Sequence, residues 1–329
     1  MKTLYIIGNG FDLAHGLKTR YQHFALFLKR NNPELFDLMV KYYWLTDLDE
    51  EDEEESLKDE SWGDFENRLS ELDFEALLED FLDYIVPIGS EEFKDRDNHV
   101  YDQQVSALID RLTKELYGEF KDFILQVEFA SEPKGLINLE EDSGFLSFNY
   151  TDTLENYYGV PRKKITYIHG RAKTEGEKTI LGHGIDPEEF EDKPAVAPAG
   201  LTEEQHFDWM QEQNDGYDYA YNQGRDTAIG YFRTSHKSTA EIIADNGPFF
   251  YSISSVEKIY VLGHSLSAVD LPYFEEIIQI NPEATWVISC RNEEDKPEII
   301  EKLEQLGVKK ENINFTTIDE LRPANPELF

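Results

Sequence analysis

Short apolar runs recur along the chain, and each has the length of a buried strand. The first is Thr3-Leu4-Tyr5-Ile6-Ile7, which runs into glycines and is followed by helical apolar spacing from Tyr21 to Arg30. Further runs of this kind are Phe145 to Phe148, Ile165 to Ile168, Thr179 to Leu181, Ile259 to Leu262, Trp286 to Ser289 and Ile313 to Ile318. Because helical segments separate the last three, the pattern predicts an α/β fold with a Rossmann-like parallel sheet.

Two long stretches interrupt this series, and helical spacing dominates both of them. The helical patterns cover Trp62 to Tyr84, Val100 to Phe129, Glu203 to Asn214 and Arg225 to Asp245. We therefore predict a discontinuous core made of residues 1–30, 131–185 and 256–329. A helical insertion at residues 31–130 and a second, mostly helical insertion at residues 186–255 would interrupt it.

Charge and cysteine content narrow the classes of partner and compartment. The 329 residues carry a formal net charge of −37, which repels a phosphate backbone, so nonspecific nucleic-acid binding is not expected. The apolar runs are far shorter than the roughly 20 residues of a membrane span, so no membrane contact is expected. A single cysteine, Cys290, and a start without a leader-like segment predict a cytoplasmic protein.

Residues 47–60 form the densest acidic run, with ten carboxylates and one lysine. Such a composition is typical of a solvated or disordered loop. An acidic interaction loop is the alternative interpretation, and a metal site is disfavoured.

Polar loops that contain or adjoin glycines follow four of the predicted strands. These loops are Gly8 to Asp12, Asn149 to Glu155, His169-Gly170 and Gly263 to Asp270. Ligands of open parallel sheets bind at the carboxyl ends of the strands, where such loops converge. We therefore expect the four loops to meet around one small ligand.

The segment Gly8-Asn9-Gly10-Phe11-Asp12 is the candidate phosphate-facing loop. Glycine tolerates positive φ and lets the backbone approach a ligand closely. The loop lacks the third glycine of the dinucleotide fingerprint and is not a P-loop, so a plain tight turn is the alternative. Asp12 would bond a ribose or a ligand amide, or cap the following turn.

Asn149 and His169 are the candidates for chemistry. The amide of Asn149 offers donors and an acceptor to a water or a ribose hydroxyl, unless it closes its own turn. Histidine titrates near neutrality and suits proton transfer, although a lone histidine at the end of a strand is more often structural.

The loop Gly263-His264-Ser265 resembles a nucleophile elbow, but His264 is the last histidine of the chain, so no histidine follows the serine as that fold requires. We expect instead a ligand-contacting loop, with Asp270 starting the next helix ahead of Pro272. His15, His169, His183 and His264 all adjoin glycines, yet they show no metal-ligand spacing. No metal site is predicted, and the roles of His15 and His183 stay open.

With these loops in order, the sequence resembles the bacteriophage abortive-infection AbiH family. The resemblance is carried by Ile7 to Leu17, Trp62-Gly63-Asp64-Phe65-Glu66, Ser147 to Thr151, Ile168-His169-Gly170, Gly182-His183-Gly184 and Leu262 to Ser265. These segments are spread over most of the chain. The family implies a role in antiphage defence.

The same loop order resembles, more distantly, the Sir2-like NAD-consuming domains of antiphage systems. That resemblance implies that Asn149 and His169 are the catalytic pair. It also places Gly8, Gly10, Ser265 and Asp270 around NAD. The chain departs from the pattern of those domains in two places: Asn9 and Phe11-Asp12 replace residues of their Gly-Ala-Gly-x-Ser loop, and Thr151 stands where they have aspartate.

The sequence thus predicts an antiphage effector that binds NAD or a related nucleotide and hydrolyses its nicotinamide-ribose bond. A module that senses a nucleotide without cleaving it is one alternative, and a metal-dependent nuclease or phosphatase is another. The expected partners are the nucleotide, a partner protein or phage trigger, and further copies of the chain in a homo-oligomer.

Overall fold

A six-stranded, all-parallel sheet forms the core of this computed structural model, which describes residues 1–86, 90, 91, 93–133, 135–173, 177, 179–191, 196–214 and 218–323. The strand order is β3-β2-β1-β4-β5-β6. The strands are β1 (Thr3–Ile7), β2 (Ser143–Ser147), β3 (Ile165–Tyr167), β4 (Lys258–Leu262), β5 (Thr285–Ser289) and β6 (Ile313–Thr316). This arrangement confirms the predicted α/β fold with a Rossmann-like core.

The central strand β1 pairs with β2 on one side and with β4 on the other, and all five of its residues are buried. Because successive side chains of a strand point to opposite faces, Leu4 and Ile6 enter one hydrophobic cluster while Tyr5 and Ile7 enter another. An apolar strand without alternation is what burial on both faces requires.

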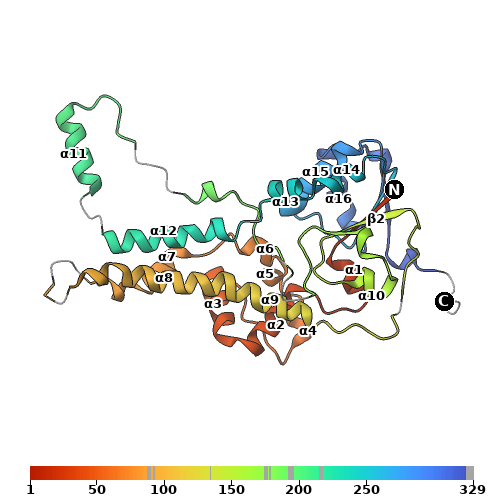
Figure 1. The fold of residues 1–329 in the computed structure, drawn as a ribbon, viewed down its shortest axis with the longest axis horizontal. Helices are drawn as coiled ribbons and strands as arrows, with labels where there is room; N and C mark the ends of the chain where they lie inside the picture. Colours follow the sequence, from red (N-terminus) through yellow and green to blue (C-terminus); the bar gives the residue numbers. More distant parts are fainter. Residues whose placement is uncertain are drawn as a thin grey trace.

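Helices cover both faces of this sheet, and Figure 1 shows the resulting layers. One face is covered by α13 (Thr239–Asp245), α14 (Gly247–Ser252), α15 (Leu271–Ile280) and α16 (Lys296–Gln305). The other face is covered by α1 (Asn9–Ala14) and α10 (Thr153–Tyr158), through Phe11 and Leu154.

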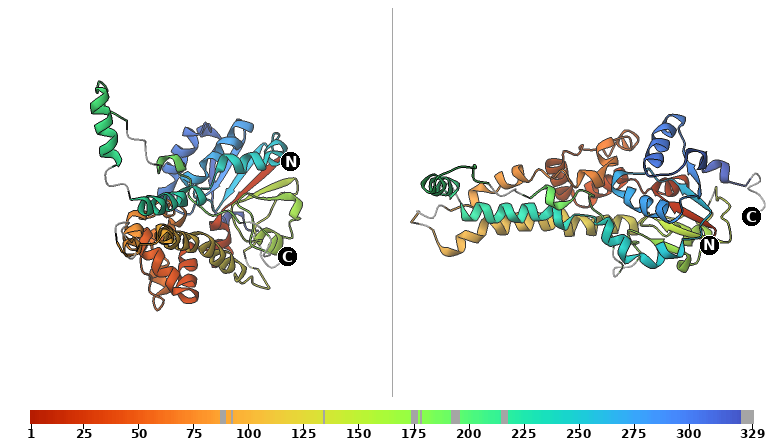
Figure 2. Two further views of the ribbon diagram at one scale, coloured as in Figure 1. Left: turned by 60° about the vertical axis from the view of Figure 1, so that its left-hand side comes forward. Right: turned by 90° about the horizontal axis from the view of Figure 1, so that it is seen from above.

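A second body, which we call the helical arm, is made of helices and extends away from the sheet. It contains α2 (Tyr21–Asn31), α3 (Pro33–Tyr43), α4 (Glu53–Ser56), α5 (Glu60–Gly63), α6 (Phe65–Arg68), α7 (Phe74–Glu79), α8 (Val100–Asp110), α9 (Leu116–Leu125) and α12 (Tyr219–Thr234). Figures 1 and 2 show α8 and α12 side by side along this arm, with α11 (Glu203–Asn214) standing apart from it. One hydrophobic cluster unites the arm, and in it Trp62 stacks on Phe36 and Phe65 with ring centroids 5.6 Å apart.

Three of the predicted helices are shorter in the structure than their apolar spacing indicated. The region from Trp62 to Tyr84 is divided among α5, α6, α7 and a 3₁₀ turn, and a π-helical turn at Arg111–Glu115 separates α8 from α9. The stretch from Arg225 to Asp245 breaks at Ser235, between α12 and α13. Apolar spacing reports which side chains are buried, but it does not report breaks in the backbone between them.

The predicted strand at Thr179 to Leu181 is wrong. Thr179 forms only an isolated antiparallel bridge with Gly170, and the Ile180 amide donates to the His169 carbonyl at 2.8 Å. Residues 179 and 180 therefore return antiparallel against His169 and Gly170, which follow β3, outside the six-stranded sheet. An apolar run that is buried by such a return has the same sequence pattern as a strand of the sheet.

The acidic run at residues 47–60 is mostly exposed to solvent, as predicted, but it is not a loop throughout. It contains α4, and cationic side chains near and within α2 hold it through the pairs Lys18–Glu53 (2.8 Å), Lys29–Asp47 (2.6 Å) and Arg30–Glu50 (3.2 Å). Charge density alone predicted a loop because the compensating cations lie elsewhere in the sequence. Within the described residues, none of the helices is both long and apolar enough to cross a membrane.

We predict that Gly263→Ala destabilises the fold, because Gly263 has a φ of +68° and an added Cβ would lie 2.1 Å from the Phe11 nitrogen. The free energy of unfolding should fall by about 2 kcal/mol or more. The matched control is Gly230→Ala in α12, where no atom lies within 4 Å of an added Cβ. It should raise stability by about 0.5–1 kcal/mol. Urea denaturation tests both, and equal midpoints for the two variants would contradict the prediction.

Candidate ligand-binding cleft

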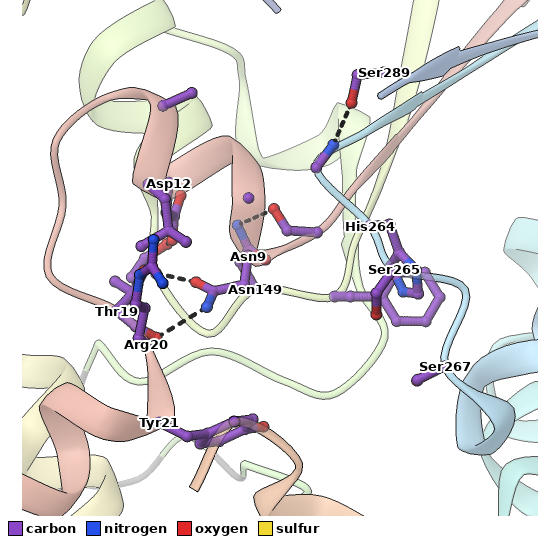
Figure 3. A pocket seen from close by; sticks show the side chains of 18 of the residues that line it. Asn9, Asp12, Thr19, Arg20, Tyr21, Asn149, His264, Ser265, Ser267 and Ser289 are labelled. Carbon is purple, nitrogen blue, oxygen red and sulfur yellow. Dashed lines mark hydrogen bonds between the residues drawn. The ribbon is translucent and has the colours of Figure 1, made fainter. Parts of the chain in front are cut away.

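A cleft of about 880 Å³ lies along the carboxyl edge of the sheet, and residues that follow all six strands line it. Figure 3 shows it from close by. The lining residues at these strand ends include Gly8, Asn9, Gly10 and Asp12 after β1; Asn149 and Thr151 after β2; His169 after β3; Gly263, His264, Ser265 and Asp270 after β4; Ser289 at the end of β5, with Cys290 and Arg291 after it; and Thr317 and Ile318 after β6.

The structure therefore brings the four predicted loops together. Of the candidate residues, Phe11 alone does not line the cleft, because its side chain is fully buried against the sheet. The loops after β5 and β6 were not predicted as part of the site. Both lack the glycine signal on which the prediction depended.

The glycines of the first loop allow its backbone to contact the backbone of the loop after β4. Gly8 has an extended backbone with φ of −116°, and an added Cβ would lie 2.6 Å from the His264 Cα. A Cβ on Gly10 would lie 2.8 Å from the Gly263 Cα, and the Gly10 amide donates to the Gly263 carbonyl at 2.7 Å. The loops after β1 and β4 therefore pack directly on each other, and together they form the floor of the cleft.

Asn9 uses its side-chain amide to fix the segment that follows α1. Its Nδ2 donates to the Thr19 carbonyl at 3.1 Å, and the Thr19 hydroxyl donates to its Oδ1 at 2.6 Å. Figure 3 shows these residues on the same side of the cleft as Arg20 and Tyr21, opposite His264 and Ser265. The Asn9 amide thus shapes the wall of the cleft.

Asp12 is buried and already bonded within the protein. Its carboxylate accepts hydrogen bonds from the hydroxyls of Thr151 at 2.5 Å and Thr153 at 2.7 Å. Burial raises its pKa from 3.8 to about 6, although these hydrogen bonds act in the opposite direction. Asp12 and Thr151, which both depart from the Sir2-like pattern, thus contact each other directly.

Asn149 ends β2 and joins two loops. Its Nδ2 donates to the Gly8 carbonyl at 3.1 Å, and its backbone amide donates to the Ser147 hydroxyl at 3.2 Å. The Asn149 amide thus ties the loop after β2 to the loop after β1, and its side chain lines the cleft.

His169 ends β3 with its side chain 3% exposed. Its Nε2 has no hydrogen-bond partner among the described residues, and its ring lies edge-on to Phe148 at 5.2 Å. Burial, followed by the charge of Lys237, holds the pKa of His169 well below 6.5. The imidazole is therefore neutral at physiological pH, with an unused nitrogen.

Asp270 stands at the centre of a buried polar cluster. Its Oδ1 lies 3.2 Å from the Lys237 Nζ and 3.6 Å from the His169 Nε2. Its Oδ2 accepts from the Ser267 hydroxyl at 2.9 Å and lies 3.4 Å from the His264 Nε2. Burial would raise the pKa of Asp270, but the charge of Lys237 and the two imidazoles hold it below the usual range.

Three members of this cluster were missed from the sequence. Lys237 is fully buried, and its Nζ lies 2.6 Å from the Glu66 Oε2, while Tyr21 donates its hydroxyl to Glu66. Glu66 is the last residue of the Trp-Gly-Asp-Phe-Glu segment, so the family resemblance singled it out, but nothing in the sequence placed it in the site. Lys237 and Tyr21 lay within helical patterns, and nothing in their local sequence indicated burial beside a carboxylate.

Arg20 and Arg291 bring cationic groups to a cleft that is also lined by the carboxyl groups of Asp12, Asp64, Glu66, Asp270 and Asp319. Both are exposed and line the cleft, and neither forms an ion pair with a described residue. Arg322, also on the cleft, pairs with Asp319 at 2.6 Å and donates to the Ala14 carbonyl at 3.1 Å. Two guanidinium groups are therefore available to an anionic ligand.

The remaining candidates have structural contacts. His15 joins α1 to α10 through the Phe11 carbonyl at 2.7 Å and the Tyr158 hydroxyl at 2.6 Å. Ser265 is exposed, and the neighbouring His264 Nδ1 accepts from the Leu266 amide at 3.0 Å instead of meeting the serine. In the described part of the chain, no three histidine, cysteine or acidic side chains are grouped so as to hold a metal ion.

We predict that Asp12→Asn changes stability in a pH-dependent way. The free energy of unfolding of the variant, compared with that of the native protein, should be higher at pH 7 than at pH 4. The folded-state pKa of Asp12 is raised to about 6, so the folded chain binds this proton more tightly and loses stability as the pH rises through the window between 3.8 and 6. Asparagine removes that loss, which amounts to about 3 kcal/mol.

Denaturant unfolding of the native and variant proteins at both pH values measures this difference. The control is Asp226→Asn on an exposed position of α12, which should change stability equally at the two pH values. An Asp12→Asn effect that is the same at pH 4 and pH 7 would show that the buried carboxyl does not titrate as described.

Comparison with known proteins gives one family. No curated protein matches the chain. The family described as "Bacteriophage abortive infection AbiH" matches residues 4–290, which include strands β1 to β5, both helical insertions and the Lys237–Asp270 cluster. Because this match covers most of the sequence, the chain belongs to the bacteriophage abortive infection AbiH family.

Proposed function

We propose that this protein is an antiphage effector that binds NAD or a related nucleotide in the cleft and hydrolyses the bond between nicotinamide and ribose. The observation that carries the proposal is the convergence of Asn149 and His169 on one cleft. The His169 Nε2 has no hydrogen-bond partner among the described residues, the Asn149 amide lines the same cleft, and Arg20 and Arg291 line it without ion pairs.

The two side chains suit the two tasks of such a hydrolysis. His169, neutral and with a free Nε2, would accept a proton from water as the water oxygen attacks the ribose C1′. The bond between C1′ and the pyridinium nitrogen then breaks, and its electron pair neutralises the departing nicotinamide. Asn149 would orient the water or a ribose hydroxyl through its amide oxygen.

The extent of the cleft supports a ligand with two ends. Neighbouring strands of a sheet lie about 4.8 Å apart, so the edge from β3 to β6 spans about 24 Å. That length accommodates a dinucleotide, with the reacting end near His169 on β3 and the other end near Arg291 after β5. Guanidinium groups form charge-assisted hydrogen bonds with phosphate oxygens.

A nucleotide-sensing module without turnover is the second candidate. The observation that favours it is the helical arm of α8 and α12, which extends far from the cleft yet belongs to the same hydrophobic cluster as residues of the cleft wall. Such an arm suits the transmission of a bound state to a partner protein. No cluster of three or more metal-ligating side chains among the described residues supports the third candidate, a metal-dependent nuclease or phosphatase.

We predict that His169→Ala and Asn149→Ala each reduce nicotinamide release from NAD by at least about 100-fold, because general acid–base groups contribute that much. Chromatography of the reaction mixture measures the product, with and without an extract of phage-infected cells. The matched control is His206→Ala on α11, which is exposed and does not line the cleft. Absence of nicotinamide release from the native protein, even with the infected extract, would refute hydrolysis.

We also predict that Arg20→Gln and Arg291→Gln each weaken binding of ADP-ribose by about tenfold, since a hydrogen bond to a charged group contributes about 1.5 kcal/mol or more. Isothermal titration calorimetry measures the dissociation constants. Arg96→Gln is the control, because Arg96 is exposed and does not line the cleft. Equal affinities for all three variants and the native chain would exclude an anion-binding role for the two arginines.

A further inference from the structure

Two side chains of the buried cluster face the same oxygen atom of Asp270. The Lys237 Nζ lies 3.2 Å from Oδ1, within hydrogen-bond distance, and the His169 Nε2 lies 3.6 Å from it, outside that distance. We propose that Lys237 is a positioning residue: by donating to this oxygen and placing its positive charge beside the imidazole, it disfavours a bond between protonated His169 and Asp270 and leaves the imidazole nitrogen free to take a proton from water. This inference rests on the proposed function for its catalytic meaning.

Lys237 is buried between two carboxylates that keep its ammonium group charged. Its side chain is fully buried, and it lies between the carboxylates of Glu66 at 2.6 Å and Asp270 at 3.2 Å. Burial would lower the pKa of Lys237, but these two carboxylates more than offset that effect. The lysine therefore stays cationic close to His169.

The backbone around Lys237 is built to fix its position. Its amide donates to the His183 carbonyl at 2.8 Å, and the His183 amide donates to the Ser235 carbonyl at 3.1 Å. This close approach requires Gly182, because an added Cβ there would lie 2.1 Å from the Ser235 oxygen.

The other side of the same segment packs against the turn that carries Asp270. A Cβ on Gly184 would lie 2.5 Å from Val269 Cγ2, and Val269 directly precedes Asp270. The Gly182-His183-Gly184 segment is thus held between the two groups that it brings together, which gives His183 a structural role.

The charge of Lys237 opposes a second positive charge on His169, while Asp270 favours one. The other titratable groups near this centre come from five parts of the fold. They are His264 from the loop after β4, Glu66 from α6, Tyr21 from α2, Tyr150 from the loop after β2 and Tyr273 from α15. Without Lys237, Oδ1 of Asp270 becomes available to His169, and the imidazole should retain its proton to a higher pH.

The decisive experiment compares Glu66→Gln with the double variant Glu66→Gln/Lys237→Met in the full chain. The double variant is used because Lys237→Met alone leaves two buried carboxylates unpaired. NMR titration of the His169 imidazole, without any nucleotide, should show a pKa higher by about one unit or more in the double variant. Lys237→Arg keeps the charge and should titrate as the native protein does.

The pH dependence of nicotinamide release supplies the second measurement. Its acidic limb should move to higher pH in the double variant by the same amount as the imidazole titration. A His169 titration that is unchanged in the double variant, or equally shifted in Lys237→Arg, overturns the role of Lys237. A shifted titration in a protein that releases no nicotinamide supports that role and overturns only the proposed reaction.

Discussion

The buried contact of Lys237 with Glu66 and Asp270 joins the three parts of this protein. Glu66 comes from the first helical insertion, Lys237 from the second, and Asp270 from the loop after β4. Removing one partner of a buried ion pair typically costs about 3–5 kcal/mol, because the remaining charge is left uncompensated. The cleft is therefore complete only when both insertions are docked on the sheet.

Because residues of the first insertion line the cleft and Lys237 of the second pairs with two cleft residues, the insertions help to form the cleft as well as the hydrophobic core. The helical arm and the cleft share residues, since Tyr21 begins α2, lines the cleft and donates to Glu66. A rearrangement of the arm that moves Glu66 or Lys237 would change the electrostatic environment of His169. The architecture thus links the His169 side of the cleft to a surface far from it.

Close contact between backbones is the second constraint on the site. Gly8 and Gly10 pack against Gly263, and Gly182 packs against the segment that carries Lys237. In both places glycine is needed because another part of the protein occupies the space of a side chain. The Asp12 carboxylate is likewise satisfied within the protein, by two threonine hydroxyls.

The sequence by itself determined the parallel sheet and the edge at which its loops gather. Runs of apolar residues in β1, β2 and β4, each followed by a polar loop, were sufficient because burial on both faces and chain reversal leave local signals. Only the tertiary structure decided which groups surround His169. Lys237 and Glu66 lie 171 positions apart in the sequence, and their pairing comes from the docking of two insertions, which no local pattern records.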